Sequence, residues 1–184
     1  MNGREIVVGV SGGIAAFKTA QIVSQLVQSG INVTVVMTSA AQRFVGAATF
    51  AALTRRPVAT DLFDERQFPL GAHIELARSA SLLVVAPATA DFLGKAAHGL
   101  ADDLLSTLYL AFSGPVLAAP AMNTEMWSKA AVQRNVRQLC DDGVRMIDPE
   151  EGWLSCRTQG VGRMANPDRI IAAVVETLNA LPSP

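Results

Sequence analysis

Short apolar runs recur along the chain at intervals of roughly one helix. Five of them are rich in Val, Leu, Ile or Ala, as buried strands of a parallel sheet are: 6–10, 33–37, 82–86, 116–119 and 144–147. Between the first two, Ile22, Val23 and Leu26 recur at helical spacing, and Gly30 follows at the position of a helix C-cap. This stretch therefore predicts a strand, a helix and a second strand.

The same spacing predicts four more helices, at 40–53, 92–112, 124–140 and 167–181. The last has Asn166 at its N-cap and Pro167 in its first turn. Such alternation is typical of a three-layer α/β domain, Rossmann-like or flavodoxin-like, in which helices flank a parallel sheet and ligands bind at the carboxyl ends of the strands. We expect a single domain over 1–184, irregular structure at 60–70 and 149–165, and a substrate lid at 149–165.

Composition excludes several classes of partner. The 184 residues carry 15 Lys and Arg against 16 Asp and Glu, a formal net charge of −1 without a basic stripe, so no nucleic-acid partner is expected. No apolar run approaches the roughly 18 to 20 residues that a membrane span needs. Because 50% of the residues are hydrophobic, we expect subunit contacts to cover part of the surface.

The two ends of the chain and its cysteines suggest a cytoplasmic protein. Arg4 leads directly into the first strand, which leaves no room for a signal peptide, and the end at Pro184 leaves none for a second domain. Cys140 and Cys156 do not form a disulfide framework or a zinc pattern. We therefore expect two free thiols, with Cys140 in the core, and no metal.

The turns after the first two strands have the chemistry of an anion site. Gly12 and Gly13 follow the first strand, where small residues let backbone amides approach a phosphate or a ring at a helix N-terminus. Neither a Walker A loop nor G-x-G-x-x-G is present, and a tight turn without ligand remains an alternative. Thr38 and Ser39 follow the second strand, where they would serve equally well as ordinary helix caps.

A stronger signal follows the fourth strand. Residues 120–127, PAMNTEMW, resemble the P-x-M-N-x-x-M-W signature of the flavin-containing cysteine decarboxylases, which include the phosphopantothenoylcysteine decarboxylases and the lantibiotic peptidyl-cysteine decarboxylases. The similarity extends over nearly the whole chain, from the turn at 11–13 to Gly162, Arg163 and Met164.

This resemblance implies an FMN site built from the turns after the strands. The positions that match its flavin contacts are Gly12, Gly13, Ile14, Thr38, Ser39, Thr89, Ala90, Asp91, Phe92 and Ala121. Asp91 stands where the family typically has Asn, and a carboxylate cannot donate a hydrogen bond as an amide does.

The resemblance also implies catalytic and substrate-binding residues. His73 matches the active-site histidine before a helix, Asn123 the residue that holds the substrate carboxylate, and Cys156 the proton donor in the lid. Met126 and Arg163 complete the expected substrate contacts, although Met126 also serves in packing. Without the resemblance, His73 would be interpreted as a capping or surface residue. In this family the flavin site is completed by a neighbouring subunit, so a homo-oligomer is implied, either a trimer or a dodecamer of trimers.

The implied reaction is FMN-dependent decarboxylation of 4'-phosphopantothenoylcysteine to 4'-phosphopantetheine, a step of coenzyme A synthesis. The thiol is oxidised to a thioaldehyde, carbon dioxide leaves, and re-reduction gives a saturated product. Ser155 and Arg157 depart from the usual Ala and Gly around Cys156. Three alternatives stay open: oxidative decarboxylation of a peptide's C-terminal cysteine, a catalytically silent FMN-binding regulatory protein and, disfavoured by Asn123, a flavin prenyltransferase.

Overall fold

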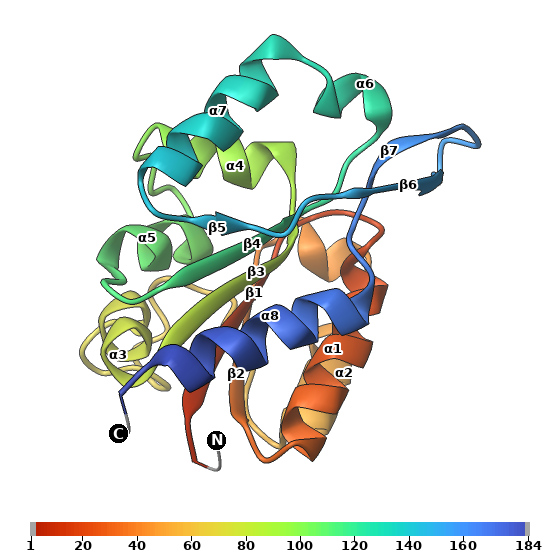
Figure 1. The fold of residues 1–184 in the computed structure, drawn as a ribbon. Coiled ribbons are helices and arrows are strands. Elements are labelled where there is room, and N and C mark those ends of the chain that lie inside the picture. Colours follow the sequence, from red (N-terminus) through yellow and green to blue (C-terminus); the bar gives the residue numbers. More distant parts are fainter. Residues whose placement is uncertain (1–2, 183–184) are drawn as a thin grey trace.

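The computed structural model describes residues 3–182, which form a parallel sheet with helices on both faces (Figure 1). Its strands run in the order β2-β1-β3-β4-β5 and are all parallel. Their bounds are Glu5–Val10 for β1, Asn32–Met37 for β2, Leu82–Ala88 for β3, Val116–Pro120 for β4 and Arg145–Met146 for β5. This is the flavodoxin-like order, and it confirms the predicted fold class.

The helices divide between the two faces of the sheet. On one face, α1 (Ala16–Gln28) packs against α2 (Ala47–Thr54) and α8 (Pro167–Ala180). On the other, α4 (Ala90–Ala97) packs against α5 (Leu104–Ala111) and α7 (Ala130–Asp141), and α3 (Ala72–Ser79) packs against α5. The predicted helix at 167–181 is thereby confirmed, with the Asn166 side chain accepting a hydrogen bond from the Asp168 amide.

Alternate residues of each strand enter two separate cores. Val8 and Val84 pack in the core beneath α1 and α8, whereas Val7 and Val85 pack in the core beneath α4 and α5. All seven residues of β3 are buried. Such burial on both faces explains why the strands appear in the sequence as continuous apolar runs.

Three of the predicted helices are shorter than the spacing of their apolar residues suggested. The segment 40–53 is a 3-10 turn, η1 (Ala41–Arg43), followed by α2, because Gly46 adopts an extended conformation between them. The segment 92–112 is α4 and α5, separated by Gly99 with a φ of +66° and by a capping box in which Asp103 accepts from Ser106. A capping box begins a helix, and apolar periodicity alone does not detect it.

The predicted helix at 124–140 is likewise divided. A single turn, α6 (Thr124–Trp127), is followed by α7, and Lys129 between them has an extended backbone. The stretch 60–70 lacks regular structure, as expected.

The stretch 149–165, predicted to be irregular, is a β-hairpin. β6 (Glu150–Trp153) pairs antiparallel with β7 (Gln159–Arg163) and forms a separate two-stranded sheet. In Figure 1 the hairpin extends away from the main sheet, past α6. Only one residue of the two strands is buried, so they lack the apolar run by which the other strands were recognised.

Within residues 3–182 no helix combines the length and the apolar character that crossing a bilayer requires.

Candidate active site at the carboxyl edge of the sheet

The turns that follow β1 and β3 are joined by one buried side chain. The Ser11 hydroxyl donates to the Pro87 carbonyl over 2.7 Å and accepts from the Thr89 amide over 2.9 Å. The same oxygen lies 3.0 Å from the Thr89 hydroxyl, which in turn accepts from the Phe92 amide and begins α4. Ser11 therefore fixes the relative position of two predicted flavin-binding turns, a role that the sequence analysis did not assign to it.

A close backbone contact at Gly12 places the turn after β2 beside the turn after β1. A Cβ atom at Gly12 would collide with the Cβ of Ala40, so the two backbones approach more closely than any side chain allows. Thr38 begins η1 by accepting a hydrogen bond from the Ala41 amide, which leaves Ser39 exposed at the edge of the site. The predicted pairing of these turns is thus present in the structure.

Several backbone amides of these turns have no acceptor among the described residues. They belong to Gly12, Ile14, Ala15, Ser39, Ala40, Ala90 and Asp91. All of them lie at the carboxyl edge of the sheet, where α1, η1 and α4 begin. Free N–H groups at helix starts attract anions, because they combine hydrogen-bond donors with the positive end of the helix dipole.

The turn after β4 is organised by Asn123. Its side-chain oxygen Oδ1 accepts from the Met126 amide over 2.8 Å and so begins α6, while the residue as a whole is exposed. Because Oδ1 is engaged, the Nδ2 group at the other end of the amide keeps its two protons for a ligand. The Ala121 amide donates to the Ala88 carbonyl, which ties this turn to the end of β3.

The hairpin is attached to the Asn123 turn at its base. The Met122 amide donates to the Gly162 carbonyl over 2.9 Å. Gly162 has a φ of +143°, and a Cβ there would collide with the Met122 carbonyl oxygen. Gly160 lies equally close to the Thr124 side chain, whose hydroxyl is buried without a hydrogen-bond partner. The proposed lid is therefore fixed at its base, where glycines allow backbone contact.

Charged side chains surround the base of the hairpin. Glu150 forms ion pairs with Arg163 and Arg169, both at 3.2 Å, and accepts from the Asn166 amide. The Asn166 hydrogen bond, followed by the two arginines, lowers the pKa of the Glu150 carboxyl. Burial and then the charge of Arg163 lower the pKa of Lys18 in the first turn of α1. Of these charged residues, only Arg163 was predicted as a site residue; Lys18, Glu150 and Arg169 lack a motif in the sequence.

The other two predicted catalytic residues lie on different elements from Asn123. His73 lies in the first turn of α3 rather than before it, and its Nδ1 atom is buried without a partner. Cys156 is exposed in the turn of the hairpin, with its sulfur 3.0 Å from the Thr158 hydroxyl. Among the described residues, no hydrogen bond joins Cys156, His73 and Asn123 to one another.

Two further predictions are modified by the side-chain environment. The Asp91 carboxylate is exposed and pairs with Lys95, one turn further along α4, whereas its backbone amide has no acceptor among the described residues. Cys140 was expected in the core but is exposed, because α7 turns the preceding residue, Leu139, toward the interior. Met126 is exposed beside Asn123, and Trp127 is half-buried.

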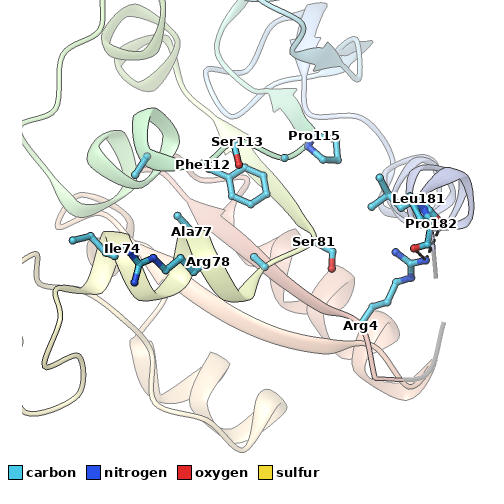
Figure 2. A pocket seen from close by; sticks show the side chains of 13 residues that line it. Arg4, Ile74, Ala77, Arg78, Ser81, Phe112, Ser113, Pro115, Leu181 and Pro182 are labelled. Carbon is cyan, nitrogen blue, oxygen red and sulfur yellow. Dashed lines mark hydrogen bonds between the residues drawn. The ribbon is translucent and has the colours of Figure 1, made fainter. Parts of the chain in front are cut away.

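A pocket of about 630 Å³ lies elsewhere in the molecule. Figure 2 shows that Arg4, Ser81 and Pro115 line it, and these residues precede β1, β3 and β4 respectively. It is therefore at the amino-terminal edge of the sheet. In a parallel α/β sheet the ligand site lies at the opposite, carboxyl edge, where the free amides are found.

The sequence and the fold both match known proteins. The family model described as Flavoprotein matches residues 1–179. The coenzyme A biosynthesis bifunctional protein CoaBC of Bacillus subtilis is 47% identical over 171 residues, which is 93% of this chain and 42% of the relative. Its counterpart from Mycobacterium tuberculosis is 45% identical over 182 residues, 97% of this chain and 43% of the relative. The chain thus spans less than half the length of these relatives.

Two solved structures have the same architecture. A mutant PPC decarboxylase complexed with pantothenoylaminoethenethiol superimposes with a TM-score of 0.87 at 30% identity, covering 96% of this chain and 99% of that one. The FMN-dependent cysteine decarboxylase SpaF superimposes with a TM-score of 0.82 at 35% identity, covering 96% and 98%.

The close contact at Gly162 gives a prediction about the hairpin. Gly162→Ala should lower the free energy of unfolding by about 2 to 4 kcal/mol, because it adds both an unfavourable φ and a collision with the Met122 carbonyl. Gly143→Ala is the matched control: its φ of +92° is also unfavourable, but a Cβ there meets no atom within 4 Å. Denaturant unfolding measures both variants, and equal losses would contradict a role for the contact.

Proposed function

The chain belongs to the Flavoprotein family, and from that membership we propose that it binds FMN and decarboxylates 4'-phosphopantothenoylcysteine (PPC) to 4'-phosphopantetheine. This makes it a carboxy-lyase of coenzyme A synthesis. One observation carries the proposal: the turn holding Asn123 and the hairpin holding Cys156 are joined by the hydrogen bond between Met122 and Gly162. The carboxylate-binding group and the proton donor thus belong to one connected unit.

The residues at the carboxyl edge fit FMN. The free amides of Gly12 and Ile14, with the hydroxyls of Thr38 and Ser39, supply donors for its phosphate. Gly13 lies against the Thr89 side chain and leaves space that a larger residue would fill. Ala90, Phe92 and Ala121 complete the cofactor site that we propose. FMN supplies the reversible two-electron oxidation and reduction that a simple carboxylate lacks.

Asn123 would bind the substrate carboxylate before the carbon–carbon bond breaks. With Oδ1 held by the Met126 amide, Nδ2 is oriented as a donor toward an anionic group. The helix cap thereby sets the orientation of the amide in advance. Met126 and Arg163, on either side of the hairpin base, are the further substrate contacts that we propose.

Cys156 would donate the proton that makes the product saturated. A thiol is a far stronger acid than an aliphatic hydroxyl, so a cysteine at position 156 suits general-acid catalysis. Its exposed position places the sulfur where an arriving substrate can reach it. The hairpin from 149 to 165 is accordingly the proposed lid.

We also propose that the active form is a homo-oligomer, a trimer or a dodecamer of trimers. Large apolar side chains are exposed near the carboxyl edge, among them Ile14, Phe17, Phe44, Phe63 and Leu70. Exposed apolar surface of this kind marks subunit contacts. Within residues 3–182 the buried Nδ1 atom of His73 has no hydrogen-bond partner, as would be expected of a residue that completes a neighbour's site.

Asn123→Asp separates the structural role of this residue from its catalytic role. An aspartate oxygen still accepts from the Met126 amide, so the protein should fold and retain FMN. Its charge would repel the substrate carboxylate, so kcat/KM should fall by at least about 100-fold. Steady-state kinetics beside flavin absorbance test this, and Asn123→Asp activity near that of the wild type would refute the carboxylate role.

Cys156→Ser tests the reaction itself. With PPC in aerated buffer, where oxygen can act as the final electron acceptor, the wild type should release the saturated aminothiol. Cys156→Ser should release mainly an unsaturated thiol two hydrogens lighter, since serine is too weak an acid.

Mass spectrometry distinguishes the two products, and Cys140→Ser, which alters the other exposed thiol, is the matched control. Saturated product from Cys156→Ser at the wild-type rate would reject the proton-donor role. A wild type that instead acts on peptides ending in cysteine would identify the lantibiotic type of activity.

The assembly is tested by sedimentation equilibrium of the FMN-loaded protein. We expect a mass of three chains or twelve. Phe63→Asp, at a side chain that is 80% exposed, should shift this mass toward that of one chain, because a buried charge opposes association. Glu65→Asp, a conservative change at a nearby exposed position, is the control. A wild-type monomer at micromolar concentration would rule out the oligomer.

A further inference from the structure

A three-residue loop at the end of the hairpin, 155–157, holds the proposed proton donor. Leu154 and Thr158 close this loop, because the Leu154 amide donates to the Thr158 carbonyl over 2.9 Å. A second backbone bond runs from the Arg157 amide to the Leu154 carbonyl, also over 2.9 Å, and forms a tight turn around Cys156. Leu154 is buried, whereas the residues of the loop are exposed. The loop is therefore anchored at its closing pair, and its backbone path is fixed.

Arg157 gives the loop its shape. Its φ is +64°, in the left-handed region that costs a residue with a side chain more than it costs glycine. Three-residue hairpin loops commonly end in such a residue, which forms a bulge and changes the direction of the chain. In a regular strand, residues two apart are separated by roughly 6.5 Å. Here the atoms Cys156 Sγ and Thr158 Oγ1, on either side of Arg157, lie 3.0 Å apart.

The chemistry of the two groups decides which of them donates in this contact. A thiol is a weak hydrogen-bond donor, so we assign the proton of the hydrogen bond to the Thr158 hydroxyl. The proton of the Cys156 thiol then stays free for a substrate. Threonine is β-branched and has few allowed χ1 rotamers, so its hydroxyl loses little freedom when it is directed at the sulfur. The thiol is thus oriented before a substrate arrives.

We propose that Thr158 is a positioning residue for the decarboxylation proposed above, on which this inference rests: it orients the Cys156 thiol for proton donation and stabilises the thiolate that remains. In this step the S–H bond of Cys156 breaks and a C–H bond forms at the carbon that lost carbon dioxide. The sulfur keeps the electron pair. The accompanying hydride comes from the re-reduction that completes the reaction. Water then returns a proton to the sulfur, which is exposed.

The hydroxyl matters most at the moment when the proton leaves. A thiolate can only accept a hydrogen bond, and a donor that is already directed at it stabilises the negative charge as it develops. Without that donor the proton transfer is slower, and the intermediate has more time to leave as the unsaturated thiol. Thr158 therefore controls how the intermediate divides between the saturated and the unsaturated product.

The test measures the ratio of unsaturated to saturated product from PPC in aerated buffer, by mass spectrometry. Thr158→Val keeps the branched shape but lacks the hydroxyl, so this ratio should rise about fivefold, the effect of one hydrogen bond. Thr158→Ser keeps the hydroxyl and should stay within about twofold of the wild type. Ser155→Ala is the matched control, because it removes an exposed hydroxyl beside Cys156 whereas the sulfur bonds to Thr158. Its ratio should equal that of the wild type.

Each alternative outcome has a distinct meaning. A wild-type ratio in Thr158→Val, with saturated product still formed, would overturn the role of Thr158 and leave the proposed function standing. Equal rises in Thr158→Val and Thr158→Ser would overturn it too, because the shape of the side chain and not its hydroxyl would then matter. An equal rise in Ser155→Ala would assign the effect to the loop in general. A wild type that forms no product from PPC would overturn the function and the inference together.

A second readout avoids catalysis. Iodoacetamide alkylates the thiolate form of a cysteine, so its rate reports how well the thiolate is stabilised. The rate is measured at neutral pH on the FMN-loaded protein carrying Cys140→Ser, which removes the other exposed thiol. Adding Thr158→Val should slow alkylation of Cys156 about twofold, since the thiolate loses a donor. A loop that is merely loosened would not react more slowly, so an equal or faster rate would contradict the positioning role.

Discussion

Burial of the parallel sheet on both faces is the constraint from which the rest of the structure follows. Helices cover each face, and every residue of β3 is buried. Polar groups can therefore gather only at the ends of the strands, and at the carboxyl ends the helices present free N–H groups. The site is polar at this edge because the fold leaves no other place where those groups remain accessible.

The residues of the site combine structural and chemical roles. Thr38, Thr89 and Asn123 each begin a helix by accepting a backbone amide, and Ser11 joins the turns after β1 and β3. A side chain that is held in this way loses little freedom when it binds a ligand, so the site is organised before the ligand arrives. The close contacts at Gly12 and Gly162 also organise the site, because they fix neighbouring turns through their backbones.

Charge is distributed unevenly along the carboxyl edge of the sheet. Neutral amides and hydroxyls line the turns after β1, β2 and β3, whereas formal positive charges cluster at the base of the hairpin around Glu150. Amides suit a cofactor that stays bound, since they stabilise an anion without repelling one another when it is absent. Lysine and arginine attract anions through their formal charge, and dissolved salt weakens this attraction.

The sequence alone determined the sheet, its flanking helices and the order of the turns, because buried parallel strands and amphipathic helices leave clear periodic signals. Local signals also predicted the Asn166 cap, and the resemblance predicts roles for His73, Asn123 and Cys156. Only the tertiary structure decided that 149–165 is a hairpin, because its strands bury a single residue and lack an apolar pattern. The tertiary structure also decided that Lys18, Glu150 and Arg169 meet, since ion pairs between distant segments leave no periodic trace in a sequence.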